Sequence, residues 1–481
     1  MNRGSFAAAG TGGPVGRTFE ARARALLARP EVRRNLAAAM DRSAVLRQRA
    51  FEGVDLGALR AAGEAIRAHT VARLDRHLAR WAERAEARGT RVFFAADAGE
   101  AVAYVLEVAR RRGVRLAVKG KSMISEEVGL NRALEEAGVE VVETDLGEHI
   151  QQLAGEPPAH ITVPAVHRSR AEVRDLFARA YRAELPDEDP AHLTRFAREV
   201  LRERFLAADL GITGVNFAVA ETGSIVIVTN EGNGRMCSSL PPVHVALMGM
   251  ERVVPSFREL AVLLPLLTGS ATGQRVTTYV NVVNGPRGPE EPDGPEELHV
   301  VVLDNGRSRI LRTRYRSILH CIRCGACLNV CPVFRQVGGL AYGSPYGGPI
   351  GAVLAPLLEG FDRAGDLPWA SSLCGACTEV CPVRIPLHEH LVALRADVAR
   401  ARAAGLERRA FRWWARAWAS PGSYGLLARL ARFAQRPFVR AGRIPRAPFP
   451  LSRWTRGRDL PPVARRTFRE RWRRGGVKGG A

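Results

Sequence analysis

Seven of the eight cysteines lie between Cys321 and Cys381, and their spacing constrains the fold more than any other feature of the 481-residue sequence. The first four, from Cys321 to Cys331, follow the pattern C-x2-C-x2-C-x3-C-P, which is typical of bacterial iron–sulfur proteins. Three closely spaced thiolates can surround one corner of a cubane cluster, while the fourth points to a second cluster. Zinc ribbons instead use pairs of cysteines about a dozen or more residues apart. The sequence therefore predicts an iron–sulfur domain.

A second motif, Cys374-x2-Cys377-x3-Cys381-Pro382, repeats the first without its leading cysteine, whose place is taken by Ser371. In two-cluster ferredoxins the last cysteine of one motif ligates the cluster of the other. We therefore expect one cluster to be held by Cys321, Cys324, Cys327 and Cys381. The other cluster is left with Cys331, Cys374 and Cys377. It is either a [3Fe–4S] cluster or a [4Fe–4S] cluster whose fourth iron is bound by Ser371, water or a substrate oxygen.

The composition bounds the class of protein. Eight cysteines are too few for a disulfide scaffold, and thiolate ligands indicate a reducing compartment. No stretch reaches the apolar length of about 18 residues that a membrane span needs. The start of the chain lacks the apolar segment of a signal peptide. We therefore expect a cytoplasmic protein.

Positive charge is concentrated towards the C-terminal end. Residues 401–481 hold 21 of the 71 lysines and arginines but only 3 of the 49 acidic residues. Tryptophans are interleaved with these arginines, a pattern that fits a membrane surface, an acidic protein or a nucleic acid. We favour peripheral docking at the inner membrane face or on an acidic partner over nucleic acid, because an electron carrier must meet a donor and an acceptor.

Apolar segments alternate with helical patterns from Arg91 onward. Strands are expected at 92–95, 114–118, 139–142, 160–164, 215–220, 224–229, 243–248 and 299–303. Strands separated by helices favour an α/β domain with a parallel or mixed sheet. We divide the chain into an N-terminal helical arm (1–60), the α/β domain (61–305), an α-helical two-cluster ferredoxin-type domain (306–395) and a small basic, mostly helical C-terminal region (396–481).

The α/β domain contains two lysines in the segment Lys119-Gly120-Lys121-Ser122, which resembles the end of a phosphate-binding P-loop. The first glycine of that pattern is missing, because Arg115 stands in its place. Since only three of the 71 basic residues are lysines, an ammonium group that arginine cannot replace is indicated here. We expect Lys119 and Lys121 to bind an anion at a helix N-terminus.

The remaining candidates are single residues. Glu221 lies in a turn between two apolar segments and is either a catalytic carboxylate or a turn acceptor. Cys237 is expected to be a buried small side chain and not a nucleophile. We expect structural roles for His149, His160 and His167.

Four segments, 119–153, 214–237, 320–358 and 371–391, resemble the lactate utilization protein B family. They include KGKSMISEEVGLNRALEE, NFAVAETGSIVIVTNEGNGRMC, HCIRCGACLNVCPVFRQVGG and SSLCGACTEVCPVRIPLHEHL. The resemblance implies an α/β domain of the sugar-phosphate isomerase and CoA-transferase type (the LUD domain), a ferredoxin-type domain with two [4Fe–4S] clusters, and a small C-terminal domain. It also implies that the seven cysteines are the family's ligands and that Ser371 stands at the missing one.

The resemblance implies the iron–sulfur electron-transfer subunit of a cytoplasmic complex that oxidises L-lactate to pyruvate and so allows growth on lactate. The implied partners are a cysteine-rich iron–sulfur protein and a second LUD-domain protein, with an unidentified electron acceptor. We do not expect this chain to carry the lactate site alone. The alternatives are the iron–sulfur subunit of another 2-hydroxyacid or glycerol-phosphate oxidase, and a redox-sensing nucleic-acid binder that uses the basic tail.

Overall fold

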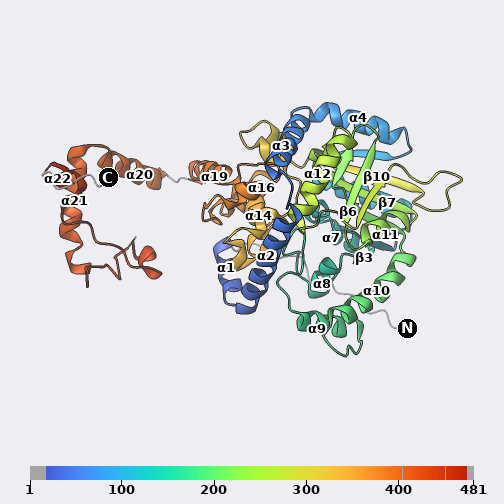
Figure 1. The fold of residues 1–481 in the computed structure, drawn as a ribbon, viewed down its shortest axis with the longest axis horizontal. Coiled ribbons are helices and arrows are strands. Elements are labelled where there is room, and N and C mark those ends of the chain that lie inside the picture. Colours follow the sequence, from blue (N-terminus) through green and yellow to red (C-terminus); the bar gives the residue numbers. More distant parts are fainter. Residues whose placement is uncertain (1–17, 403–404, 450, 474–481) are drawn as a thin grey trace. The chain divides into compact units, whose positions relative to one another are not determined.

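The computed structural model describes residues 18–402, 405–449 and 451–473. The chain forms two compact units, of which the first ends at Val398 and the second begins at Ala399 (Figure 1). No helix of the described residues is both long enough and apolar enough to cross a membrane.

A six-stranded sheet in which all neighbours are parallel forms the centre of the first unit. Its order is β1 (Arg91–Ala95), β10 (Glu297–Leu303), β7 (Val243–Gly249), β4 (Leu210–Gly214), β2 (Leu116–Lys119) and β3 (Glu140–Glu143). Apolar residues run almost without interruption through β7 and β10 because helices cover both faces of a parallel sheet. The carboxyl ends of β2 and β4 meet where the strand order reverses, which is the usual ligand-binding edge of such sheets.

A smaller sheet has the order β8 (Val253–Val254), β5 (Phe217–Val219), β6 (Ser224–Thr229) and β9 (Tyr279–Val283). Helix α4 (Leu74–Glu86) buries Trp81 against this sheet, and the indole N–H donates to the carbonyl of Ser224. The side chains of Phe217 and Val226 lie in the same core as the cysteine-rich segment. The α/β domain and that segment therefore share one continuous core.

Nine helices complete the α/β part. They are α5 (Ala98–Arg111), α6 (Met123–Val128), α7 (Leu130–Glu136), α8 (Leu146–Ala154), α9 (Arg170–Tyr181), α10 (Pro190–Ala207), α11 (Asn233–Ser239), α12 (Phe257–Ala271) and α13 (Arg307–Leu311). The strand expected at 160–164 is wrong, because this segment forms turns. The ring Nδ1 of His160 accepts hydrogen bonds from the backbone N–H groups of Thr162 and Val163, and such local bonds compete with a strand.

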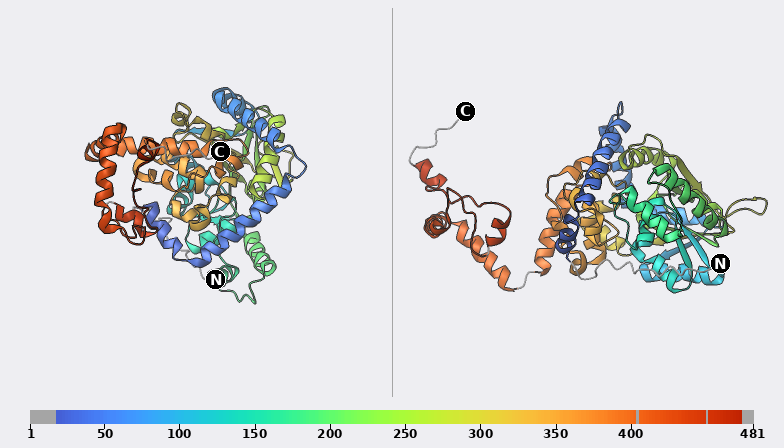
Figure 2. Two further views of the ribbon diagram at one scale, coloured as in Figure 1. Left: turned by 60° about the vertical axis from the view of Figure 1, so that its left-hand side comes forward. Right: turned by 90° about the horizontal axis from the view of Figure 1, so that it is seen from below.

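The cysteine-rich segment is built from short helices. They are α14 (Ala326–Asn329), α15 (Phe334–Val337), α16 (Gly348–Glu359), α17 (Phe361–Ala364), α18 (Ala376–Val380) and α19 (Leu387–Arg402). The N-terminal helices α1 (Phe19–Leu27), α2 (Pro30–Ala50) and α3 (Leu56–Ala72) pack beside it, with α2 against α14 and α15 (Figures 1 and 2). Leu36 and Met40 of α2 are buried in the shared core.

The second unit contains α20 (Gly405–Ala419), α21 (Pro421–Ala434) and α22 (Phe468–Arg473). Helices α20 and α21 contact each other, and an antiparallel bridge joins Ile444 to Leu460. Arg432 of α21 pairs with Glu470 of α22 at 3.1 Å, which links these two helices.

Candidate metal centre

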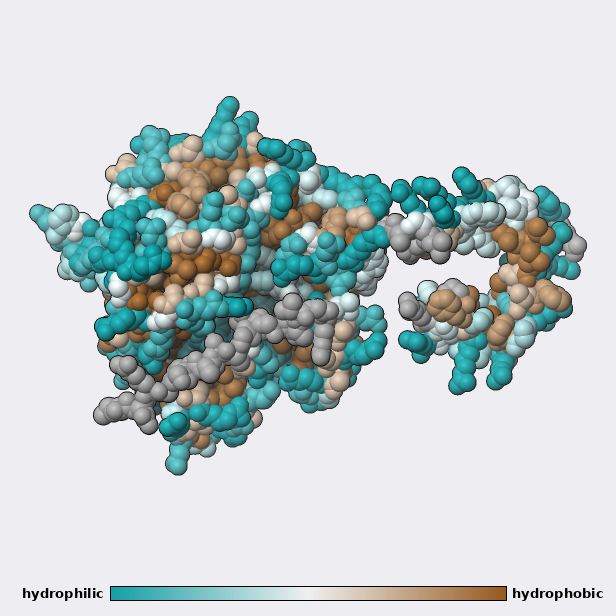
Figure 3. Space-filling model, turned by 180° about the vertical axis from the view of Figure 1, so that it is seen from behind, coloured by the Kyte–Doolittle hydropathy of each residue, from teal (hydrophilic) through white to brown (hydrophobic). Residues whose placement is uncertain are grey.

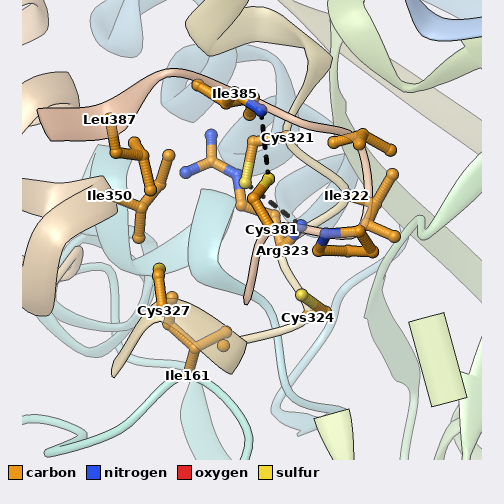
Figure 4. Close-up of a pocket in the computed structure, with 13 residues that line it drawn as sticks. Ile161, Cys321, Ile322, Arg323, Cys324, Cys327, Ile350, Cys381, Ile385 and Leu387 are labelled. Carbon is orange, nitrogen blue, oxygen red and sulfur yellow. Dashed lines mark hydrogen bonds between the residues drawn. The ribbon is translucent and has the colours of Figure 1, made fainter. Parts of the chain in front are cut away.

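Four cysteines from the two motifs line one cavity in the first unit (Figure 4). We call Cys321, Cys324, Cys327 and Cys381 the first cysteine set. The rest of the lining is mostly apolar and includes Ile161, Ile350 and Leu387. The empty space is about 370 Å³, including the part that is open to solvent. The cavity therefore brings together cysteines that lie up to 60 positions apart in the sequence.

The other three motif cysteines, Cys331, Cys374 and Cys377, form the second cysteine set. Electrostatic interactions link Cys331 with Cys374, and Cys377 with both. In the first set Cys327 interacts in the same way with Cys321, Cys324 and Cys381. Among the described cysteines these interactions connect no member of one set to a member of the other.

The two motifs repeat one backbone conformation. Arg323 and Leu373 each precede the second cysteine position of their motif, and both have positive φ, 61° and 57°. This region is rare for residues with a side chain, so the local turn imposes it on both. The N–H of Arg323 donates to the Sγ of Cys321 at 3.3 Å, and the N–H of Leu373 donates to the Oγ of Ser371 at 3.1 Å. The Ser371 hydroxyl therefore occupies the place of the first thiol.

Ser372 is a neighbour of Cys374 that the sequence analysis did not identify as part of the site. Its hydroxyl hydrogen-bonds the thiol of Cys374, and the backbone N–H of Ala376 also points at that sulfur. Together they lower the pKa of Cys374, which is the exposed cysteine of the second cysteine set. Ser371 thus stands where the first motif has a thiol, as the sequence predicts, and Ser372 contacts the next thiol, which the sequence did not predict.

The donor atoms fit an iron–sulfur cluster. Burial raises the pKa of Cys381 to about 11, so a bound metal is needed to hold the buried thiol as a thiolate. The N–H of Ile385 donates to its sulfur at 3.3 Å, a contact that stabilises negative charge there. Thiolates are the ligands that iron–sulfur clusters require, and both cysteine sets supply them.

A single zinc ion does not fit the same cysteines. No group of three or more His, Cys, Asp or Glu side chains in the described ranges is arranged to hold one metal ion. With Zn–S bonds of about 2.3 Å, a tetrahedral site would place its sulfur atoms about 4 Å apart. The described thiols do not meet this geometry for one ion, and the motif spacing favours an iron–sulfur cluster.

Arginines surround the first cysteine set. Electrostatic interactions link its thiols to Arg47 and Arg60, from helices α2 and α3, and to three further arginines. Those three are Arg67, Arg252 and Arg323. In the second set the carboxyl group of Glu379 acts on the thiol of Cys374.

Sequence reasoning missed these arginines. Arg323 could have been noticed, because it lies inside the first C-x2-C pair. Arg47, Arg60 and Arg67 lie more than 250 residues before the motif and carry no local signal. Tyr342 was also missed: it is fully buried, it interacts with Cys327 and Cys331, and its hydroxyl has no described partner. It therefore lies between the two sets.

The two lysines of the α/β domain are already paired. Lys119 is fully buried, and its Nζ lies 2.6 Å from Glu143 and 3.1 Å from Glu126. Burial would lower the pKa of Lys119, but these carboxylates outweigh it and raise the pKa well above its usual value. Lys121 Nζ lies 2.9 Å from Asp145. The chain's own carboxylates thus hold the ammonium groups, which leaves Lys119 no position for an external anion.

Glu221 lies at the turn between β5 and β6, where its side chain is exposed. Its backbone N–H donates to Pro255 O, and the described residues give its carboxylate no ion pair. Cys237 is buried, with its thiol 3.4 Å from the Thr144 hydroxyl, and burial raises its pKa to about 12. Cys237 therefore interacts with Lys119 and Glu143 as a buried thiol, whereas Glu221 lies in an exposed turn.

Three family models match the chain in succession. A LUD domain matches residues 78–303, a 4Fe-4S dicluster domain matches 317–385, and the C-terminal domain of lactate utilisation protein B matches 391–477. The first two matches agree with the α/β domain and with the segment that holds both cysteine sets.

Relatives match over most of the chain. Lactate utilization protein B of Shouchella clausii is 49% identical over 88% of this chain and 89% of its own, and that of Bacillus velezensis is 50% identical over 85% and 87%. The protein of the same name from Geobacillus thermodenitrificans is 49% identical over 88% and 89%. A solved DUF162 family structure from Deinococcus radiodurans aligns with 48% of this chain and 98% of its own at 16% identity and a TM-score of 0.28, which is too low to carry an argument.

Proposed function

Because the chain belongs to the lactate utilization protein B family, we propose that it is the iron–sulfur electron-transfer subunit of a complex that oxidises L-lactate to pyruvate. The observation that carries the proposal is the grouping of the motif cysteines into two sets, one of which draws on both motifs within a single cavity. A single-cluster carrier would need only one such set.

We assign one [4Fe–4S] cluster to the first cysteine set, Cys321, Cys324, Cys327 and Cys381. A second cluster, [4Fe–4S] or [3Fe–4S], is assigned to Cys331, Cys374 and Cys377, with Ser371 at the fourth position. When bound, the two clusters supply one-electron storage, which allows the two electrons of lactate to be passed on singly. Support comes from the matching backbone turns of the two motifs and from the separation of their thiol interactions.

The residues around the cysteines suit an electron relay. Apolar side chains such as Ile350 and Leu387 keep water away from the first cysteine set. Cys374 of the second set is exposed, and the indole of Trp369 nearby in the sequence is 49% exposed. An electron can thus be held in the interior at the first cysteine set. It can be exchanged with another protein at the second set, through the exposed Cys374.

The oxidation of lactate itself is assigned to the complex and not to this chain alone. The proposed partners are a cysteine-rich iron–sulfur protein and a second LUD-domain protein, which pass electrons to a further acceptor. Lys119 and Lys121 remain candidates for a supporting role in the α/β domain, where their carboxylate partners favour structural roles. Glu221 is the weaker candidate because its carboxylate is exposed and unpaired among the described residues.

We further propose that the second unit docks on an anionic lipid surface at the cytoplasmic face of the membrane. In α20 the side chains of Phe411, Trp414 and Trp418 follow one another on one face and are 64%, 62% and 38% exposed. In α21 the exposed face is Leu426, Leu430 and Phe433. Figure 3 shows apolar surface on this unit beside polar surface.

Charge decides between the possible occupants of these faces. Residues 401–481 carry 21 cationic and 3 acidic side chains, and this excess of positive charge favours an anionic partner. Amphipathic helices with Trp, Phe and Leu on one face and arginine on the other lie in the headgroup region of anionic membranes. A nucleic acid would satisfy the arginines but would leave the leucines in water.

The electron-transfer proposal is tested by EPR spectroscopy of the anaerobically purified chain mixed with its two partner proteins. L-lactate should reduce the clusters in the mixture, and the chain without partners should stay oxidised. Glycerol 3-phosphate serves as the second substrate. Reduction by glycerol 3-phosphate and not by lactate would make the chain the iron–sulfur subunit of a glycerol-phosphate oxidase.

The docking proposal is tested by sedimentation of the full chain with vesicles. Binding is expected to vesicles that contain phosphatidylglycerol and not to pure phosphatidylcholine. Trp414→Ala with Trp418→Ala should weaken binding about tenfold or more, whereas Trp454→Ala, an exposed tryptophan outside α20 and α21, should not. Tight, salt-dependent binding to single-stranded DNA without vesicle binding would overturn the proposal, as would the absence of binding to either.

A further inference from the structure

Arg323 is a buried cation at the first cysteine set, and some of its N–H groups are unpaired among the described residues. It lines the same cavity as Cys321 and Cys327, and only 9% of the residue is exposed. Figure 4 shows its guanidinium beside Cys321. Its Nε and Nη1 groups are buried and have no hydrogen-bond partner among the described residues. A buried N–H group without a partner is costly, so an acceptor in the cavity is expected.

The other side of Arg323 is fixed in place. Its Nη2 lies 3.4 Å from the carboxylate of Glu251, and its guanidinium lies 4.3 Å from the centre of the Tyr346 ring. Glu251 also pairs with Arg307 at 2.8 Å. Burial would raise the pKa of Glu251, but its arginine partners, led by Arg307, outweigh burial and lower it to about 2. Glu251 is therefore a permanent anion that anchors Arg323.

The second motif provides a comparison within the same chain. Leu373 has the position and backbone conformation of Arg323 but carries no charge. Arginines act on the thiols of the first cysteine set, whereas the carboxyl group of Glu379 acts on Cys374 of the second. The two sites thus differ in local charge although their turns are alike.

We propose that Arg323 tunes the cluster of the first cysteine set, by donating from Nε and Nη1 towards its sulfur atoms and by placing a positive charge beside it. The inference rests on the proposed function, because it requires that cluster. A cluster held by four thiolates is anionic and gains a further negative charge on reduction. A nearby cation and N–H donors stabilise the reduced form more than the oxidised form, so they raise the midpoint potential.

The test is an EPR-monitored redox titration of the full chain without lactate or partners. Arg323→Leu, which copies the residue of the second motif, should lower the electron affinity of the first cluster at least tenfold, or about 59 mV for a one-electron couple. Glu251→Gln should shift the same potential upwards, because it removes the anion that offsets Arg323. The second cluster should keep its potential in both variants.

Arg314→Leu is the matched control, since it removes an exposed arginine of the same domain that pairs with Asp397. It should leave both potentials unchanged. Iron and sulfide are measured in the natural chain and in every variant. A natural chain without clusters counts against the proposed function and not against the role of Arg323. Unchanged potentials in Arg323→Leu with both clusters present would overturn the inference. If that variant loses its cluster, an unchanged or lower potential in Glu251→Gln overturns it instead.

Discussion

Ser371 and Cys321 occupy matching positions in the two cysteine motifs, and the serine has an oxygen where the cysteine has a sulfur. Both side chains accept the N–H of the residue two positions on. Two chemical outcomes follow from this geometry. In the first, the oxygen of Ser371 or a neighbouring side chain coordinates the fourth iron of the cluster. In the second, that iron has no protein ligand and can bind the hydroxyl and carboxylate of a 2-hydroxy acid. We favour the closed site, because a relay needs no open iron.

Ser371→Cys separates these outcomes. The variant completes the four-cysteine motif, so both clusters should be retained and lactate turnover with the partner proteins should stay within about twofold of the natural chain. The measurements are iron and sulfide content, the EPR spectrum and dye reduction. Lost turnover in a variant that keeps both clusters, together with loss of a lactate-induced EPR change, would instead make the open iron a substrate site.

Lys119 is expected to act on stability. Its ammonium is fully buried among Glu143, Glu126 and Glu148, so its removal leaves uncompensated buried carboxylates. Lys119→Met should lower the free energy of unfolding by about 3–5 kcal/mol, the usual cost of breaking a buried ion pair. Chemical denaturation measures this loss. Arg132→Met, which breaks an exposed pair with Glu136, is the control and should leave stability unchanged.

A different result would restore the anion-binding role of Lys119. Phosphate or lactate that protects the natural chain against denaturation, and fails to protect Lys119→Met, would show a ligand at the ammonium. Lys119→Arg keeps the charge but changes its shape, so it should be destabilised if the carboxylates are fitted to an ammonium.

Helices α8 and α9 form an element whose packing should depend on pH. The ring of His149 in α8 stacks with Tyr181 of α9, and its Nε2 lies 2.7 Å from the Tyr181 hydroxyl. Burial lowers the pKa of His149 to about 4, whereas the unfolded chain has about 6.5. Between these values the unfolded state binds more protons, so stability is lost as the pH falls.

The expected loss is about 1 kcal/mol between pH 6.5 and pH 5.5, since one pKa unit corresponds to about 1.4 kcal/mol. Hydrogen exchange in α8 and α9, corrected for the intrinsic rate, measures it. His149→Gln keeps a donor for Tyr181 but does not titrate, so its protection should be nearly independent of pH. An equal pH dependence in both proteins would contradict the assignment.

At the scale of the whole molecule, local patterns were predicted well and distant contacts were not. The cysteine spacing, the family and the α/β domain followed from the sequence because each depends on nearby residues, and the family models and the parallel sheet confirm the family and the fold. The strand at 160–164 was wrong because the His160 side chain takes over the backbone N–H groups.

The arginines around the first cysteine set show why the rest could not be predicted. Arg60 donates to the carbonyl of Cys381 at 2.9 Å across 321 residues, and Arg67 donates to that of His320 at 3.2 Å. Such contacts depend on how α3 packs in the shared core, which no periodicity in the sequence encodes. The cysteine ligand sets were predicted from the motif rule, and they remain a prediction until a cluster is measured.

The most direct test of the account is the grouping of EPR signals lost in single cysteine variants of the anaerobically purified chain. Cys321 and Cys381 lie 60 residues apart in the sequence but belong to the first cysteine set. Cys321→Ser and Cys381→Ser should therefore damage the same cluster signal. Cys331→Ser should damage the other signal together with Cys374→Ser. Losses that group by motif, with Cys381 sharing the signal of Cys374, would contradict the two-cluster arrangement proposed for this chain.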